Sequence, residues 1–280
     1  MDADLVSLSG YALMFVLGLR HGLDPDHIAM IDSMVYRSLA ERPRAAAWVG
    51  TWFALGHGLT VTLIAVLVGA IAGAASMPAA LIAPLAWLPT VLLLIVGTLN
   101  LRDLLGARAY QVSGWKHHIV PARLRTSSHP FAMLLTGVVF ALVFDTATQA
   151  AAWGYAASAH AGELARVHAG TDGGTYAGTA AALAVGLTFT AGMVNIDTLD
   201  GRLMVRLLRR LSGAAQVQAY RRKVGWLVVA MSYAMALYSI ASHCHPQLAL
   251  GDTALTIAGA LLLALVSGYA WMAGRQRGIM

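Results

Sequence analysis

Ionisable side chains are concentrated in one short part of the chain, residues 20–32, which lies inside a long apolar stretch. They are Arg20, His21, Asp24, Asp26, His27 and Asp32. In a membrane-spanning helix each Asp, Lys or Arg costs about 2.5–3.5 kcal/mol on insertion scales. Imidazole and carboxylate groups kept there at such a cost indicate a functional site. Together, and without a thiolate, they suit a borderline divalent ion such as Ni²⁺, Co²⁺ or Zn²⁺, rather than Mg²⁺ or Ca²⁺.

The spacing of these groups predicts a site on a broken helix. At roughly 100° per residue, His21, Asp24 and His27 share one stripe of a helix. On the same wheel Asp26 points elsewhere. Pro25 has no N–H, so the carbonyl of His21 loses its i+4 partner and the helix is expected to break there. Such a break could turn Asp26 toward the histidines and expose a backbone carbonyl, so the sequence leaves open whether Asp24 or Asp26 is a ligand.

Polar residues in later apolar stretches are further candidates for the same site. His57 is flanked by glycines, which permit close helix approach, and is either another nitrogen ligand or a hydrogen-bonded core histidine. Asp145 and Asp197 are expected to orient histidines or to line the path of the ion. The predicted metal ligands are His21, Asp24, Asp26, His27 and His57. The residues predicted to lie along the path or behind the ligands are Asp145, Thr146, Asn195, Asp197 and Asp200.

Composition predicts the elements that must position these residues. Hydrophobic residues make up 58% of the 280-residue chain and charged residues only 11%, whereas soluble domains carry roughly a quarter charged residues. Apolar runs of about 20 residues recur, and inside a bilayer their backbone must satisfy its own hydrogen bonds as helix. We therefore expect an all-α, polytopic transmembrane helix bundle that forms one transport domain, residues 1–280. Its seven expected spans are 5–36, 45–75, 80–105, 129–160, 176–200, 221–243 and 252–273.

Loop charges predict the orientation of this bundle. Arginine-rich connections alternate with connections that carry few or no basic residues, which predicts an N-terminus outside and a C-terminus in the cytoplasm. The expected location is the cell (inner) membrane, with the lipid bilayer as a partner and the oligomeric state left open. The Gly-rich segment 172–175 is expected to be an external loop.

Charge distribution and cysteine content exclude other classes of protein. The net charge of +6 comes from short loops, without a basic stripe and interleaved aromatics, so nucleic-acid binding is not expected. Cys244 is the only cysteine, which excludes an intramolecular disulfide and a cysteine-based zinc motif. A metal site in this chain must therefore use mainly nitrogen and oxygen ligands.

Four motifs, in this order along the chain, resemble the signature of the nickel/cobalt transporter (NiCoT) family. They are Arg20-His21-Gly22-Leu23-Asp24-Pro25-Asp26-His27-Ile28, Leu55-Gly56-His57, Phe144-Asp145-Thr146-Ala147-Thr148, and Gly192-Met193 through Asp197-Thr198-Leu199-Asp200. The resemblance implies a single-chain permease with Ni²⁺ or Co²⁺, or both, as the transported substrate and with no cofactor. It maps the signature His and Asp residues of the family onto His21, Asp26 and His27. The second histidine motif maps onto His57.

The chain departs from the family pattern in three places. The familiar form has eight helices, and this chain is expected to start at the second. Pro25 stands where a small residue such as Ala is common, and Gln149 replaces a Glu, which removes one carboxylate. Without the first helix, the signature helix would run from outside to inside, as the loop charges independently require.

Other functions fit parts of this pattern. Related proteins export nickel and cobalt, but the connection 106–128 holds only His117 and His118, so import is preferred. His-x4-Asp also occurs in glycerolipid acyltransferases, and seven-helix intramembrane zinc hydrolases use several His and an Asp. Against these, His21 is expected at mid-span, and the last span has no histidine to complete a zinc triad. The chain is therefore expected not to be an enzyme, and its ligand types do not separate Ni²⁺ from Co²⁺.

Overall fold

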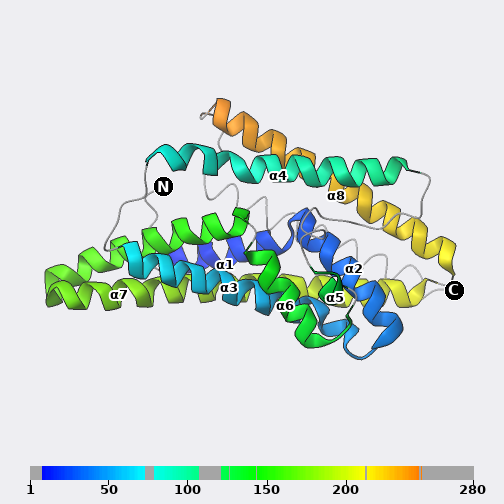
Figure 1. Ribbon diagram of the computed structural model, residues 1–280, viewed down its shortest axis with the longest axis horizontal. Coiled ribbons are helices and arrows are strands. Elements are labelled where there is room, and N and C mark those ends of the chain that lie inside the picture. Colours follow the sequence, from blue (N-terminus) through cyan, green and yellow to red (C-terminus); the bar gives the residue numbers. More distant parts are fainter. Residues whose placement is uncertain are drawn as a thin grey trace.

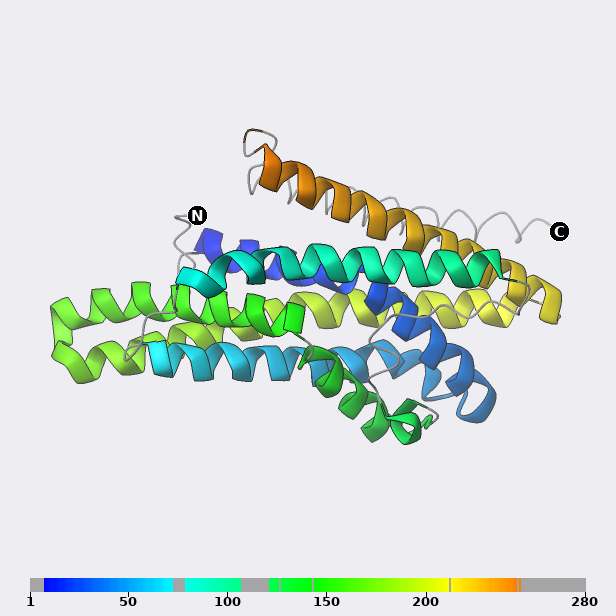
Figure 2. The same ribbon diagram turned by 45° about the horizontal axis from the view of Figure 1, so that its top comes forward.

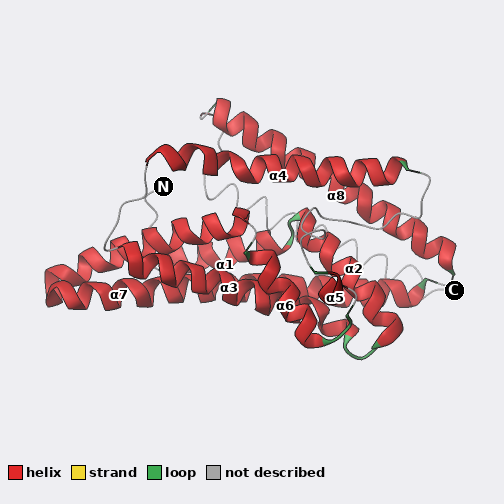
Figure 3. Ribbon diagram, viewed as in Figure 1, coloured by secondary structure: helices red, strands yellow, loops and turns green. Residues whose placement is uncertain are grey.

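A computed structural model describes residues 8–72, 79–106, 121–125, 127–142, 144–211, 213–245 and 247. Within these residues the regular structure is entirely helical, as Figure 3 shows, which confirms the predicted all-α class. The helices are α1 (Leu8–Gly22), α2 (Pro25–Glu41), the short 3₁₀ helix η1 (Ala46–Trp48), α3 (Val49–Ala72), α4 (Ala79–Leu105), α5 (Ala122–Arg125), α6 (Pro130–Ala141), α7 (Phe144–Arg210) and α8 (Ala214–Cys244).

The first predicted span is broken where Pro25 predicts a break. α1 ends at Gly22, Asp24 is extended, and Pro25 opens α2, where its missing N–H removes no helical hydrogen bond. The carbonyl of His21 accepts a hydrogen bond from the backbone N–H of Asp24 at 2.9 Å. Contrary to the expectation, the carbonyl of His21 is therefore not left without a donor, because the N–H of Asp24 in the same turn bonds to it.

The remaining predicted spans fit the described helices with two differences. α3, α4 and α8 cover the second, third and sixth spans, whereas the fourth is interrupted between the end of α6 and the start of α7. The helical backbone of α7 runs without interruption from Phe144 to Arg210, and Figures 1 and 2 show it doubling back at one end of the molecule. Segment 172–175 is thus helical, and the expectation of a loop there is wrong. Each glycine lowers the stability of a helix by about 1 kcal/mol, which is too little to exclude a helix on its own.

Three helical segments of the described chain are long and apolar enough to cross a bilayer. They are Ala46–Val68, Ala177–Arg210 and Ala215–Cys244. The seventh predicted span, 252–273, lies outside the described residues. The number of spans and the orientation of the chain therefore stay predictions.

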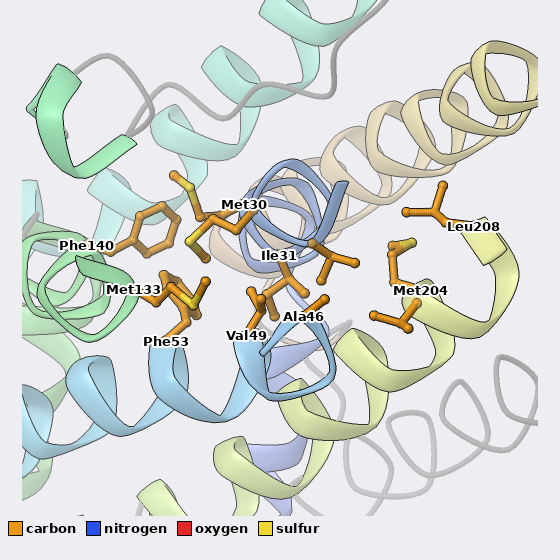
Figure 4. Close-up of a cluster of buried hydrophobic side chains, with 12 residues drawn as sticks. Met30, Ile31, Ala46, Val49, Phe53, Met133, Phe140, Met204 and Leu208 are labelled. Atoms are coloured by element: carbon orange, nitrogen blue, oxygen red, sulfur yellow. The ribbon is translucent and has the colours of Figure 1, made fainter. Parts of the chain in front are cut away.

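Buried side chains form three clusters that join different helices. The first joins α2, η1, α3, α6 and α7, and Figure 4 shows its members Met30, Ile31, Ala46, Val49, Phe53, Met133, Phe140, Met204 and Leu208. The second joins α1, α3 and α7 around Phe189, and the third joins α2, α4 and α8 around Val228. α4 and α8 pack along each other on one side of the molecule (Figures 1 and 2). α2 supplies buried residues both to the first cluster and to the third, so it joins this pair to the other helices.

Glycines bring α1 and α7 into backbone contact. A Cβ built at Gly18 of α1 would overlap the carbonyl of Phe189, and a Cβ built at Gly192 of α7 would overlap the carbonyl of Phe15. Small residues of this kind allow membrane helices to approach closely. The contact fixes the height of α7 against α1, and it thereby sets which α7 side chains face the end of α1.

Candidate metal centre

Three buried histidines from three helices converge at the break between α1 and α2. One ring nitrogen of His21, one of His27 and one of His57 all lie within 4.8 Å of one another. The Nε2 atoms of His21 and His57 are 3.4 Å apart. The ring centroid of His27 lies 4.7 Å from that of His21 and 4.8 Å from that of His57. The structure thus brings these three predicted residues together, and their role as metal ligands stays a prediction.

The helix break is what lets the first two histidines meet. His21 lies in the last turn of α1 and His27 in the first turn of α2. Figure 2 shows that α2 leaves α1 at an angle. The rings of His21 and His27 meet across the break in a T-shaped contact. A Cβ at Gly22 would overlap the side chains of Ile196 and Asp197, so only glycine lets α1 end this close to α7.

Two carboxylates contact the rings on their Nδ1 side. Asp24 Oδ2 lies 2.9 Å from Nδ1 of His21, and Asp197 Oδ2 lies 3.2 Å from Nδ1 of His27. Metal-ligating histidines commonly donate their other ring N–H to a carboxylate, which fixes the tautomer and the ring orientation. Both contacts have the geometry of such a histidine–carboxylate pair. They favour Asp24 and Asp197 as partners of the histidines over a direct ligand role.

Asp26 is placed differently from Asp24. Its Oδ1 accepts a hydrogen bond from the backbone N–H of His27 at 3.1 Å, so the carboxylate lies at the positive N-terminal end of α2. Asp26 is buried and, with Asp24, it lies within electrostatic range of Asp197. Several carboxylates therefore surround the three imidazoles, which makes the centre attractive to a cation.

Phenylalanines enclose the histidines. The rings of Phe53 and Phe140 meet His27 edge-on, with centroids at 5.2 and 5.5 Å, and Phe189 lies 5.5 Å from His21. All three phenylalanines are fully buried. Sequence reasoning missed Phe140 and Phe189, because each is one apolar residue in a long apolar run. A dry wall of this kind strengthens electrostatic interactions inside the site.

The structure separates the remaining predicted residues. Asn195 is exposed and its Nδ2 donates to the carbonyl of Ala191 in its own helix, so it is not brought to the histidines. Asn195 lies two residues before Asp197, which is a rotation of about 200° around the helix axis, so the two side chains point in different directions. Asp200 lies within electrostatic range of Asp197. Asp145 and Thr146 lie in α7, but their side chains are outside the described part of the structure, as are His117 and His118.

An ion pair that the sequence did not predict lies on the other side of α2. Nε of Arg221, in α8, donates to Oδ2 of Asp32 at 3.2 Å, and both side chains are buried. Asp200 is within electrostatic range of Asp32 as well as of Asp197. The sequence placed Arg221 in a basic run at the start of the sixth predicted span, 221–243, and gave no sign of its partner.

Comparisons with known proteins find relatives that are named nickel and cobalt transporters. The chain is 31% identical to a high-affinity nickel transport protein of Cupriavidus necator over 70% of this chain and 59% of that protein. It is 30% identical to the cobalt transport protein NhlF of Rhodococcus rhodochrous, over 69% of this chain and 58% of that protein. For the nickel transporter NixA of Staphylococcus aureus the identity is 29%, over 69% of this chain and 60% of that protein. The chain thus spans less than two thirds of these relatives, and no solved structure gives a significant match.

Residues 7–273 match the family NicO, described as high-affinity nickel-transport protein. The matched region contains all four motifs that carry the resemblance and every histidine of the centre. It is also a family of transporters and not of enzymes, which argues against the hydrolase and acyltransferase alternatives. Since the match covers most of the chain, this protein belongs to the NicO family of high-affinity nickel-transport proteins.

Proposed function

We propose that the protein imports Ni²⁺, Co²⁺ or both across the cell (inner) membrane, and that His21, His27 and His57 are the nitrogen ligands of the ion in transit. The observation that carries this proposal is the convergence of three ring nitrogens within 4.8 Å of one another. Two imidazole nitrogens bound at about 2.1 Å to one tetrahedral ion lie about 3.4 Å apart. The distance between Nε2 of His21 and Nε2 of His57 is 3.4 Å, which fits such an ion.

The donor set suits selection without permanent capture. Neutral imidazoles prefer borderline ions such as Ni²⁺ and Co²⁺ over Mg²⁺ and Ca²⁺, which prefer oxygen. Passage requires that the ion be held tightly enough to enter and weakly enough to leave. Asp24 and Asp197 hold the rings of His21 and His27 in place, so the donors need little reorganisation when an ion arrives.

The histidine centre also links transport to protons. A protonated imidazole cannot bind a metal ion, so metal and proton compete for the same nitrogens. Acidification on the side from which the ion enters is expected to slow uptake. Equal uptake rates with and without a proton gradient would remove proton coupling from the account while leaving the metal site in place.

The proposed membrane arrangement is a multi-pass domain over residues 1–280, with seven spans, the N-terminus outside and the C-terminus in the cytoplasm. Three apolar helical segments of sufficient length support it, as does the alternation of basic and weakly basic connections. Labelling of single cysteines placed in the connections, in intact cells, tests each assignment.

Uptake of radioactive Ni²⁺ and Co²⁺ into membrane vesicles tests the proposed function. Vesicles that contain the protein are expected to accumulate the ion, and His27→Ala is expected to abolish accumulation. His243→Ala is the matched control, because His243 is exposed at the end of α8 and its Nδ1 contacts the carbonyl of Ser239. Accumulation that is the same for the His27 variant as for the unaltered chain would contradict the proposal.

A further inference from the structure

The Asp32–Arg221 ion pair leaves one buried carboxylate oxygen without a hydrogen-bond partner among the described residues. Arg221 donates to Oδ2 of Asp32, whereas Oδ1 of Asp32 is buried and has no hydrogen-bond partner among the described residues. Oδ2 of Asp200 is also buried and has no partner among them. A buried carboxyl group without a counter-charge is stable only if it is protonated or paired with a cation, and the one guanidinium here donates to Asp32. Asp32 and Asp200 together can therefore accommodate a further cation in place of a proton.

Asp200 connects this region to the histidine centre. It lies within electrostatic range of Asp32 and of Asp197, and Asp197 contacts Nδ1 of His27. Asp197 and Asp200 are one helical turn apart on α7, so their side chains lie on the same face. A series of buried carboxylates therefore leads from the three imidazoles to the contact between α2 and α8.

We propose that Asp32 and Asp200 form a second cation site, which receives the ion that leaves the histidines, and that Arg221 competes with the ion for Asp32. This proposal rests on the proposed transport function. With no ion present, the guanidinium neutralises Asp32 and also lies over the ring of Tyr36, 4.5 Å from its centroid. With a divalent ion at Asp32, the two positive charges repel each other and the guanidinium moves away.

The chemistry of the second cation site suits release. Carboxylate oxygens bind Ni²⁺ and Co²⁺ less selectively than imidazole does. An ion that leaves three nitrogens for two oxygens is therefore held less tightly, and the return of Arg221 to Asp32 displaces it. In ion channels, too, an ion passes through several binding sites, each weak enough to let it move on.

A purely structural ion pair is the alternative, and a charge-neutral double variant separates the two. Replacing both members of a buried ion pair is often tolerated, whereas removing one member is strongly destabilising. If the pair only joins α2 to α8, Asp32→Asn with Arg221→Gln should fold and transport normally. If Asp32 binds the ion, the same double variant should fold but take up Ni²⁺ at least about tenfold more slowly.

The chain offers a matched control for this pair. Asp103 is exposed near the end of α4, and Arg222 donates to the carbonyl of Leu104, next to it in sequence. Asp103→Asn with Arg222→Gln removes the same two charges nearby and is expected to leave uptake unchanged. Size-exclusion elution and thermal unfolding of each purified variant show whether it folds.

Binding of Mn²⁺ tests the second cation site independently of transport. Mn²⁺ prefers oxygen ligands, and electron paramagnetic resonance reports its free fraction. In purified full-length protein with His27→Ala, we expect weak Mn²⁺ binding that Asp32→Asn removes. The Asp32→Asn, Arg221→Gln double variant should lack this binding too. Arg221→Gln alone should tighten it about tenfold, because the competitor is gone.

The two experiments distinguish the failure of each proposal. If vesicles with the unaltered chain take up no Ni²⁺ but Mn²⁺ binding follows the expected pattern, the transport function fails and the second cation site stands. If the Asp32, Arg221 double variant folds and transports at the normal rate, the second cation site is wrong. Mn²⁺ binding that Asp32→Asn leaves unchanged would overturn it as well.

Discussion

The histidine centre lies at the start of α2, the proposed second cation site lies near the middle of the same helix, and the two are built from different donors. At the start of α2, three imidazoles face one another, and carboxylates contact the rings of two of them from behind. One to two turns further along, Asp32 instead accepts a hydrogen bond from the guanidinium of Arg221 and lies within electrostatic range of Asp200. In the proposed mechanism, nitrogen donors would give the first site a preference for borderline ions, whereas oxygen donors would hold the ion less tightly at the second.

The surroundings of the two regions differ as much as their donors. Phenylalanines enclose the histidines, and glycine contacts bring the backbones of α1 and α7 together beside them. The Asp32–Arg221 pair instead lies where α8, packed mainly on α4, joins α2. A site that selects an ion by geometry needs donors held in place, whereas a site that releases an ion needs a partner able to move.

The largest effect is expected at Gly22, because the histidine centre needs a residue without a side chain at this position. In Gly22→Ala the new Cβ would overlap Ile196 and Asp197, which pushes α7 away and separates Asp197 from His27. We expect a loss of Ni²⁺ uptake of about 100-fold in vesicles. Gly106→Ala is the control, since a Cβ there meets only backbone oxygens at 3.4 Å and beyond. Normal uptake by the Gly22 variant would mean that this close approach is dispensable.

A smaller loss of Ni²⁺ affinity is expected when the negative charge of Asp197, beside Nδ1 of His27, is removed without a change in side-chain shape. Asp197→Asn keeps the side-chain volume but removes the negative charge beside Nδ1 of His27, and a neutral acceptor stabilises the ring N–H less. Calorimetric Ni²⁺ affinity of the purified protein should fall about 10–100-fold. Asn195→Ala, two residues earlier and exposed, should bind Ni²⁺ as the unaltered chain does. If Asp197→Asn and Asn195→Ala bind Ni²⁺ with the same affinity, Asp197 does not contribute to metal binding at the histidine centre.

Changes in the aromatic wall should affect stability more than ion binding. Phe140→Leu removes the edge-on contact with His27 and shrinks a fully buried side chain, which should lower the free energy of unfolding by about 1 kcal/mol. Phe131→Leu on the same helix is the control, because Phe131 is exposed. Thermal unfolding in detergent compares the two. Equal midpoints for these variants would argue against a tightly packed wall.

The smallest effect is expected for a hydrogen bond between α3 and α7 whose two members are not proposed as ligands of the ion. Oγ1 of Thr51 and Oγ1 of Thr198 are 2.7 Å apart, and such bonds in membrane proteins contribute about 0.6 kcal/mol. Thr51→Val should lower stability by that amount and leave uptake unchanged. Thr198→Val in addition should cost little more, because the bond is already lost. Additive losses would show that the two hydroxyls act independently.

Local rules predict part of this structure well. Proline chemistry predicts the break before α2, and the glycines beside His57 predict its close approach to a neighbouring helix. The helical class follows from composition, because a backbone in lipid must bond to itself. These features depend on residues that are neighbours in sequence, which is why they are readable from it.

Long-range pairing is what the sequence does not disclose. His27 contacts Asp197, 170 positions away, and Asp32 pairs with Arg221 across 189 positions. Which residues meet depends on how helices pack, and one residue of helical rotation changes the facing side chain by about 100°. The same rotation explains why Asp197 reaches the centre and Asn195 does not.

X-ray absorption at the nickel edge, on purified protein loaded with one equivalent of Ni²⁺, tests the histidine centre most directly. We expect imidazole nitrogens at about 2.0–2.1 Å from the metal. The number of these nitrogens should drop in His21→Ala, His27→Ala and His57→Ala, and stay constant in His243→Ala. An all-oxygen shell in the unaltered protein, or an imidazole signal that none of the three variants reduces, would contradict the proposed site.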